Sequence, residues 1–229
     1  MPRLTLDREI HLVQDEVLLL GSMVEQAMLK AVDALKHRDL AAAHLIRNND
    51  ELINEKRYAI ENRVLILFAT QQPMAHDLRQ LAAILEIITE LERMGDYAKG
   101  IAKTVIIIDE DETPIPIREI SSMADMAVSM LHRALGAFMA EDVTLAYSIP
   151  EEDDKVDELY NYIYRKTIDA MIANPDTIDH GSNIMWVVHN IERMADRVTN
   201  ICERTVFIAT GELLEMSSSD NEWDEEFDA

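Results

Sequence analysis

The amino-acid sequence repeats itself at an interval of about one hundred residues, and this repeat limits the folds open to the chain. The motif ERMGD at 92–96 recurs as ERMAD at 192–196. Upstream, the segment 23–35 resembles 123–135, and DELIN at 50–54 resembles DDKVD at 153–157. Self-similarity at a fixed interval is typical of a structural unit used more than once. We therefore expect two copies of one unit within the 229 residues.

Each copy is predicted to be helical. Only six glycines and six prolines occur in the chain, and between the prolines apolar residues recur with helical periodicity and almost no strand-like alternation. The predicted helices span 6–37, 40–70, 74–108, 118–139, 142–172 and 177–214. Pro150 is expected to kink the fifth helix or to delay its start. The predicted fold class is all-α, with six long helices arranged as two repeated antiparallel three-helix bundles.

The domain limits follow from acidic and proline-rich segments. Residues 109–116 read DEDETPIP, a composition that ends a helix and stiffens a connection. The last 14 residues contain six acidic residues and no basic one, which is typical of a disordered tail. We predict a first bundle at 1–110, a linker at 111–117, a second bundle at 118–215 and an acidic disordered tail at 216–229.

The charge balance excludes several classes of partner. Asp and Glu number 44 against 21 for Lys and Arg, so the formal charge is −23, which disfavours contact with nucleic acids. A single cysteine excludes an intrachain disulfide, and the chain has no Cys/His cluster for a structural zinc ion. The sequence also has no signal peptide and no apolar run long enough to span a membrane. We therefore expect a cytoplasmic protein that does not span the membrane.

A pair of acidic residues in the repeated motif indicates a cation site. On a helical wheel Glu192 and Asp196 lie together at the edge of the apolar stripe of the last helix. Like charges four residues apart destabilise a helix by roughly 0.2–0.5 kcal/mol, and a bound cation would reverse that effect. Mg²⁺, Ca²⁺, Mn²⁺ and iron are hard cations that prefer such oxygen ligands.

Each half carries a second polar pair on its middle helix, which antiparallel packing could bring opposite the motif. The hypothesis is therefore two metal sites, one in each bundle. The predicted ligands are Asp50, Asn54, Glu92 and Asp96 in the first site and Asp153, Asp157, Glu192 and Asp196 in the second. The second-rank candidates on the same flank of the last helix are Asn200 and Glu203.

Three further segments, together with the two motifs, resemble the PhoU family, the phosphate-uptake regulators. The segments are 23–26 (MVEQ), 72–79 (QPMAHDLR) and 200–203 (NICE), and the resemblance covers roughly residues 8–214. It implies two three-helix bundles and a negative regulator of phosphate uptake and the phosphate-starvation response. Such a protein acts in the cytoplasm, also at the inner face of the plasma membrane through its partners. The implied partners are the ATPase of the phosphate ABC transporter, a sensor histidine kinase and a second copy of the chain.

The resemblance also implies multinuclear metal clusters, with iron the expected metal and other divalent cations as alternatives. It assigns ligand roles to seven of the predicted site residues: Asp50, Glu92, Asp96, Asp153, Asp157, Glu192 and Asp196. Asn54 stands where the second half has an acid, so the first site carries less negative charge and the two sites need not be equivalent.

Two alternatives stay open from the residues. The acids could be solvated helix faces of a metal-free scaffold, with Arg93 and Arg193 neutralising the aspartates three residues away. A carboxylate-bridged di-iron enzyme is the other alternative, but such enzymes use an ExxH motif and none of the seven histidines has Glu three residues before it. The preferred hypothesis is therefore a non-enzymatic, metal-binding regulatory adaptor.

Overall fold

The computed structural model describes residues 2–108 and 116–216, and its long elements are all α-helices. They are α1 (Pro2–His37), α2 (Leu40–Gln71), α3 (His76–Ile107), α4 (Ile117–Ala140), α6 (Asp153–Ala173) and α7 (Ile178–Thr210). This arrangement confirms the predicted all-α fold with six long helices. None of the described helices contains a segment that is long and apolar enough to cross a membrane.

The predicted fifth helix is interrupted around Pro150. A short helix α5 (Val143–Ser148) is followed by a 3₁₀ turn η1 (Pro150–Glu152), and α6 begins only at Asp153. Proline has no backbone N–H to donate, so it is tolerated at the first turn of a helix but not in its interior. The break at Pro150 therefore delays the long helix, one of the two expected outcomes, and it places Asp153 in the first turn of α6.

Repeat-related residues begin the middle helices of the two halves. The Asp39 carboxylate accepts a hydrogen bond from the N–H of Ala42 (2.9 Å), and the Asp142 carboxylate accepts one from the N–H of Leu145 (3.0 Å). Such caps satisfy backbone donors that a helix start leaves unpaired. At the other end of the chain Gly211 has a φ of 81°, so α7 ends at Thr210 rather than at the predicted 214.

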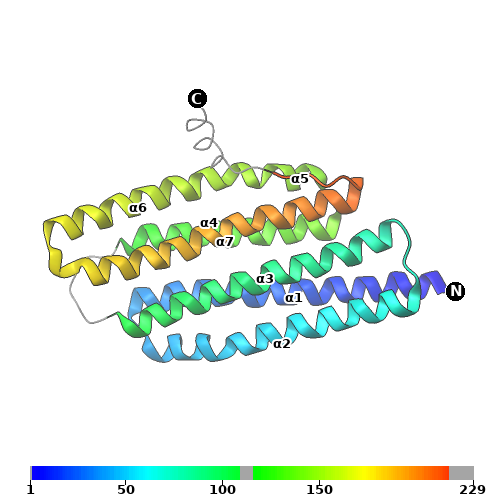
Figure 1. Cartoon of the computed structure of the whole chain (residues 1–229), viewed down its shortest axis with the longest axis horizontal. Helices are drawn as coiled ribbons and strands as arrows, with labels where there is room; N and C mark the ends of the chain where they lie inside the picture. The colour runs from blue at the N-terminus through cyan, green and yellow to red at the C-terminus, as the bar shows by residue number, and fades with distance from the viewer. Residues whose placement is uncertain (1, 109–115, 217–229) are drawn as a thin grey trace.

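The helices form two groups that pack side by side. Helices α1, α2 and α3 contact one another, and α4 and α6 both contact α7. Figure 1 shows the two groups as neighbouring layers whose helices run along the same long axis. Apolar side chains from both groups belong to one continuous core. The structure thus confirms the two three-helix bundles.

The two groups meet along α3 with α7 and along α1 with α4. The second contact is close, because a Cβ atom at Gly21 would lie 2.2 Å from Cδ1 of Leu135. A side chain at Gly21 would therefore require the Leu135 side chain to move. The domain limits at 1–110, 111–117 and 118–215 stay predictions, and the linker residues 111–115 and the tail from 217 onward lie outside the described residues.

Candidate functional site

The structure brings the four predicted residues of the first site together where α2 faces α3, which we call the first cluster: Asp50, Asn54, Glu92 and Asp96. Asp50 is buried, and its Oδ2 accepts a hydrogen bond from Nδ2 of Asn54 at 3.2 Å. A fifth residue, Lys99, enters the same cluster. Its Nζ lies 2.5 Å from Oδ2 of Asp50 and 3.4 Å from Oδ1 of Asp96, so the ammonium joins carboxylates of α2 and α3.

Charges within the first cluster alter its titration. Burial raises the pKa of Glu92 above its ordinary value, and the nearby charges of Asp96 and Asp50 add to that increase, while Arg57 opposes it. The hydrogen bond that Lys99 donates to Asp50 raises the pKa of Lys99, against the opposing effect of burial. The lysine is therefore held in its charged form, and it offsets the repulsion among the carboxylates.

The second cluster comprises Asp153, Asp157, Glu192 and Asp196, on facing helices α6 and α7. Asp153 is almost fully buried, at 1% exposure. It lies in the first turn of α6, where the helix dipole favours a negative charge. The short turn between α6 and α7 makes the two helices antiparallel, and it sets Asp157 opposite the segment that carries Glu192 and Asp196.

Aromatic side chains flank the second cluster. The ring of Tyr160 on α6 lies 6.5 Å from the ring of His189 on α7, and Nδ1 of His189 lies 3.2 Å from Oε2 of Glu192. Burial raises the pKa of Tyr160, with a further contribution from the charge of Glu192. Burial together with the charge of Arg193 lowers the pKa of His189, so this imidazole is held toward its neutral form.

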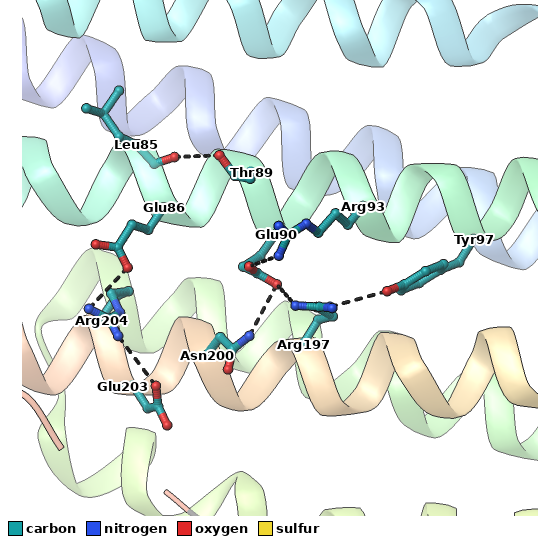
Figure 2. Close-up of polar contacts among 10 residues, drawn as sticks. All are labelled: Leu85, Glu86, Thr89, Glu90, Arg93, Tyr97, Arg197, Asn200, Glu203 and Arg204. Atoms are coloured by element: carbon teal, nitrogen blue, oxygen red, sulfur yellow. Dashed lines mark hydrogen bonds and ion pairs between the residues drawn. The ribbon is translucent and has the colours of Figure 1, made fainter. Parts of the chain in front are cut away.

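The second-rank candidates Asn200 and Glu203 contact residues outside the second cluster. Figure 2 shows Asn200 Nδ2 donating a hydrogen bond to Oε2 of Glu90 on α3, at 3.2 Å. Glu203 Oε1 accepts a hydrogen bond from the N–H of Met216 at 2.8 Å, and its Oε2 lies 3.6 Å from Nη2 of Arg204. Asn200 thus holds α7 against α3, and Glu203 holds the segment that follows α7.

The arginines of the two motifs contact residues on or near α3. Arg93 Nη1 donates to Oε1 of Glu90 at 2.9 Å, and the guanidinium of Arg193 lies over the ring of Tyr97, 5.2 Å from its centroid. The ion partner of Asp96 is Lys99. In place of the alternative in which Arg93 neutralises Asp96, the structure shows an Arg93–Glu90 contact at the junction of the two bundles.

Comparison with known proteins identifies the fold and both repeats. A family model described as the PhoU domain matches residues 17–105 and again residues 120–205. The chain belongs to the PhoU family. Each of the two matched segments contains one cluster, so the family's repeated domain and the repeat seen in the sequence coincide.

Curated relatives extend the similarity over almost the whole chain. A phosphate-specific transport system accessory protein PhoU homolog of Streptococcus pneumoniae serotype 4 is 35% identical over 211 residues, covering 92% of this chain and 98% of the relative. A protein of the same name from Clostridium acetobutylicum is 31% identical over 218 residues, covering 95% of this chain and 100% of the relative. These relatives support an accessory or regulatory role in phosphate transport.

Two crystal structures have the same architecture as this PhoU-family chain. The phosphate transport system regulatory protein PhoU from Streptococcus pneumoniae has a TM-score of 0.86 and 34% identity, covering 92% of this chain and 100% of the other. PhoU from Pseudomonas aeruginosa has a TM-score of 0.84 and 31% identity, covering 90% of this chain and 99% of the other. The names of these relatives describe regulatory rather than catalytic proteins.

The ligand roles of the eight predicted residues stay predictions. In residues 2–108 and 116–216 no three His, Cys, Asp or Glu side chains have an arrangement that could hold a metal ion. Carboxylate side chains of either cluster would therefore have to rotate to surround a cation.

Two residues of the candidate site were not predicted from the sequence and become evident only in the structure. Lys99 enters the first cluster, although a lysine three residues after an aspartate reads as an ordinary helix pair. Arg57 acts on the charge of Glu92 from α2. A signal for Lys99 exists in the repeat, because the equivalent residue one hundred positions later is Thr199.

Proposed function

We propose that this PhoU-family chain is a non-enzymatic regulator that restrains phosphate uptake and the phosphate-starvation response. In this proposal it acts in the cytoplasm, as a homodimer, and links the ATPase of the phosphate ABC transporter to a sensor histidine kinase. The observation that carries the proposal is the match of both repeats to one domain, together with coverage of 98% and 100% of the length of the two relatives described. Similarity over nearly the full length of these accessory proteins supports the same role for this chain.

The regulatory role is tested in a bacterial strain that lacks its resident family member and carries a phosphate-starvation reporter. Expression of the full chain should return the reporter to its repressed level in phosphate-rich medium. A chain truncated after the first bundle serves as the control, since it retains only one of the two matched domains. A reporter that stays fully active while the full chain accumulates would contradict the proposal.

The link to the transporter is tested with purified components. The full chain should bind the transporter ATPase and the cytoplasmic part of the kinase in size-exclusion chromatography, and the chain alone should elute as a dimer. Elution as a monomer would contradict the dimer. If either the ATPase or the kinase fails to co-elute with the chain, the adaptor role is contradicted.

We further propose that metal binds at carboxylate clusters of this chain, and the residues of the second cluster fit a cation better than those of the first. The second cluster offers four carboxylates, and the hydroxyl of Thr199 is buried on the same face of α7. Among the described residues this hydroxyl has no hydrogen-bond partner. Asp153, Asp157, Glu192 and Asp196 would hold the ion, which would link α6 to α7 and present a positive centre to an anion or an acidic group of a partner.

Elemental analysis of protein purified without added metal tests this second proposal. The matched variant replaces all four motif acids: Glu92→Gln, Asp96→Asn, Glu192→Gln and Asp196→Asn. Metal in the parent at more than one ion per chain, lost in the variant, would support clustered-carboxylate sites, and iron would be the expected metal. Equal metal contents in the two proteins would contradict the metal sites and favour the alternative in which these acids are solvated residues on helix faces.

A further inference from the structure

We infer that Lys99 supplies the cation of the first cluster, so that this cluster holds its carboxylates together without a metal ion. Metal binding is then confined to the second cluster, and this part of the inference rests on the proposed metal-binding function. The two halves of the chain would share one fold and one motif while differing in what neutralises their acids.

The geometry around Lys99 carries the first part. The ammonium lies 2.5 Å from Asp50 on α2 and 3.4 Å from Asp96 on α3, so it already makes the interhelical link that a bound metal would provide. A metal ion ligated by both carboxylates would have to take the place of this ammonium. The displaced lysine would then face a divalent cation of the same sign.

Other residues around the first cluster also disfavour a bound metal ion. Arg57 lies close enough to Glu92 to favour its negative charge, and the fourth member of the cluster is the neutral amide of Asn54. The three carboxylates therefore face the ammonium of Lys99 and the guanidinium of Arg57, which also pairs with Glu61 at 3.2 Å. The Asn54 amide donates a hydrogen bond to Asp50. The two positive charges reduce the attraction of the cluster for a divalent cation.

The repeat-equivalent positions of the second cluster carry neither of the two positive charges. Thr199 stands where the first half has Lys99, and Tyr160 stands where it has Arg57. The fourth member is Asp157, an acid in the place of Asn54. At about 100° per residue Thr199 lies only about 20° from Glu192 on the wheel of α7, so its buried hydroxyl belongs to the cluster face. An oxygen donor thus replaces an ammonium.

An exchange of the two residues tests the inference, with Mn²⁺ as the probe. Full-length protein is stripped with a chelator and dialysed against Mn²⁺, and bound metal is measured together with the melting temperature. In the wild type, Glu192→Gln with Asp196→Asn should abolish the bound Mn²⁺, and Glu92→Gln with Asp96→Asn should leave it unchanged. Lys99→Thr should add Mn²⁺ to the first cluster with at least tenfold higher affinity than the wild-type cluster. Thr199→Lys should weaken binding at the second cluster at least tenfold.

Two controls separate charge from folding. Lys103→Thr removes an exposed lysine one helical turn from Lys99 and should leave Mn²⁺ binding unchanged. Thr199→Val removes the hydroxyl without adding a charge, and it should weaken binding less than Thr199→Lys. If Lys99→Thr lowers the melting temperature of the stripped protein, Mn²⁺ should restore it. Circular dichroism checks that each variant keeps its helix content.

The possible failures are distinguishable. Equal loss of Mn²⁺ from both motif variants would overturn the inference and leave the metal-binding proposal standing. Unchanged binding in Lys99→Thr would overturn the inference as well. Absence of Mn²⁺ from the wild type and from Lys99→Thr would overturn the metal-binding proposal, and with it the confinement of metal to the second cluster.

Discussion

The junction between the two bundles depends on Glu90, and its replacement provides a quantitative test of how the halves are held together. Figure 2 shows Oε2 of Glu90 accepting hydrogen bonds from Nη1 of Arg197 (3.1 Å) and from Nδ2 of Asn200 (3.2 Å). Its Oε1 accepts the hydrogen bond from Arg93. The Glu90 side chain is only 13% exposed, so water reaches its carboxylate poorly. Replacing Glu90 by Ala would remove all three bonds, two of which join α3 to α7 while the third lies within α3.

The expected loss in the free energy of unfolding depends on the contacts that remain in Glu90→Ala. A hydrogen bond to a charged group contributes about 1.5–3 kcal/mol, but Arg197 keeps its bond to the hydroxyl of Tyr97 at 3.2 Å. Arg93 can turn to water, since its side chain is 47% exposed. We therefore expect Glu90→Ala to lower the free energy of unfolding by about 2–4 kcal/mol. For a chain of this length that corresponds to a fall in melting temperature of roughly 4–16 °C.

Urea and thermal unfolding followed by circular dichroism measure this loss. The matched control is Glu86→Ala, because Glu86 lies one turn before Glu90 on α3 and pairs with Arg204 on α7 at 3.1 Å, also drawn in Figure 2. The Glu86 side chain is 57% exposed, so its pair should contribute less than about 1 kcal/mol. Equal losses for the two variants would refute the reasoning, since burial of Glu90 would then have no effect on the strength of its contacts.

Two further predictions concern the interior. A Cβ at Gly95 would lie 3.2 Å from both Cδ1 and Cγ2 of Ile53, so Gly95→Ala should cost about 1–3 kcal/mol from overpacking, partly offset by a gain in helix propensity of about 1 kcal/mol. The second half has Ala195 and Val156 at the equivalent places. Gly95→Ala with Ile53→Val should therefore be more stable than the sum of the single effects, by about 0.5–1.5 kcal/mol in a double-mutant cycle, and additivity would contradict the packing account. Burial raises the pKa of the Cys202 thiol to about 12. At pH 8 the native protein should hence resist alkylation, whereas protein unfolded in guanidinium should react within minutes; rapid labelling of the native protein would contradict the burial.

The fold could be predicted from the sequence because its signals are local. Apolar residues at helical spacing identify the faces that become the core, and prolines and the two capping aspartates mark where helices stop and start. Helix α2, for example, was predicted at 40–70 and spans Leu40–Gln71. The missed boundaries have local causes as well. Ala75 takes a positive φ of 46° after Pro73, so α3 begins at His76 instead of Met74.

The candidate site was only partly predictable, because contacts between distant residues decide its chemistry. The repeat located the acidic residues and paired each motif with the middle helix of its own half. It did not reveal that Lys99 reaches Asp50, a residue 49 positions earlier, or that Asn200 bonds to Glu90 across 110 positions. A helical wheel gives the face on which a side chain lies, but the register between two helices decides which charges meet.

The two halves differ both in their packed interior and on the cluster face, and the fold constrains these two kinds of change differently. The apolar positions of α3 and α7 must match their neighbours in either half, and Gly95 with Ile53 has changed together with its equivalents to keep the same total size. The cluster face has no such constraint, because a cation of any kind relieves the repulsion between its acids. On the proposal that Lys99 takes the place of a metal ion, a lysine in one half and a threonine in the other change the function of the cluster and leave the architecture intact. In that case the shared fold of the two halves of this chain would not require that both bind metal.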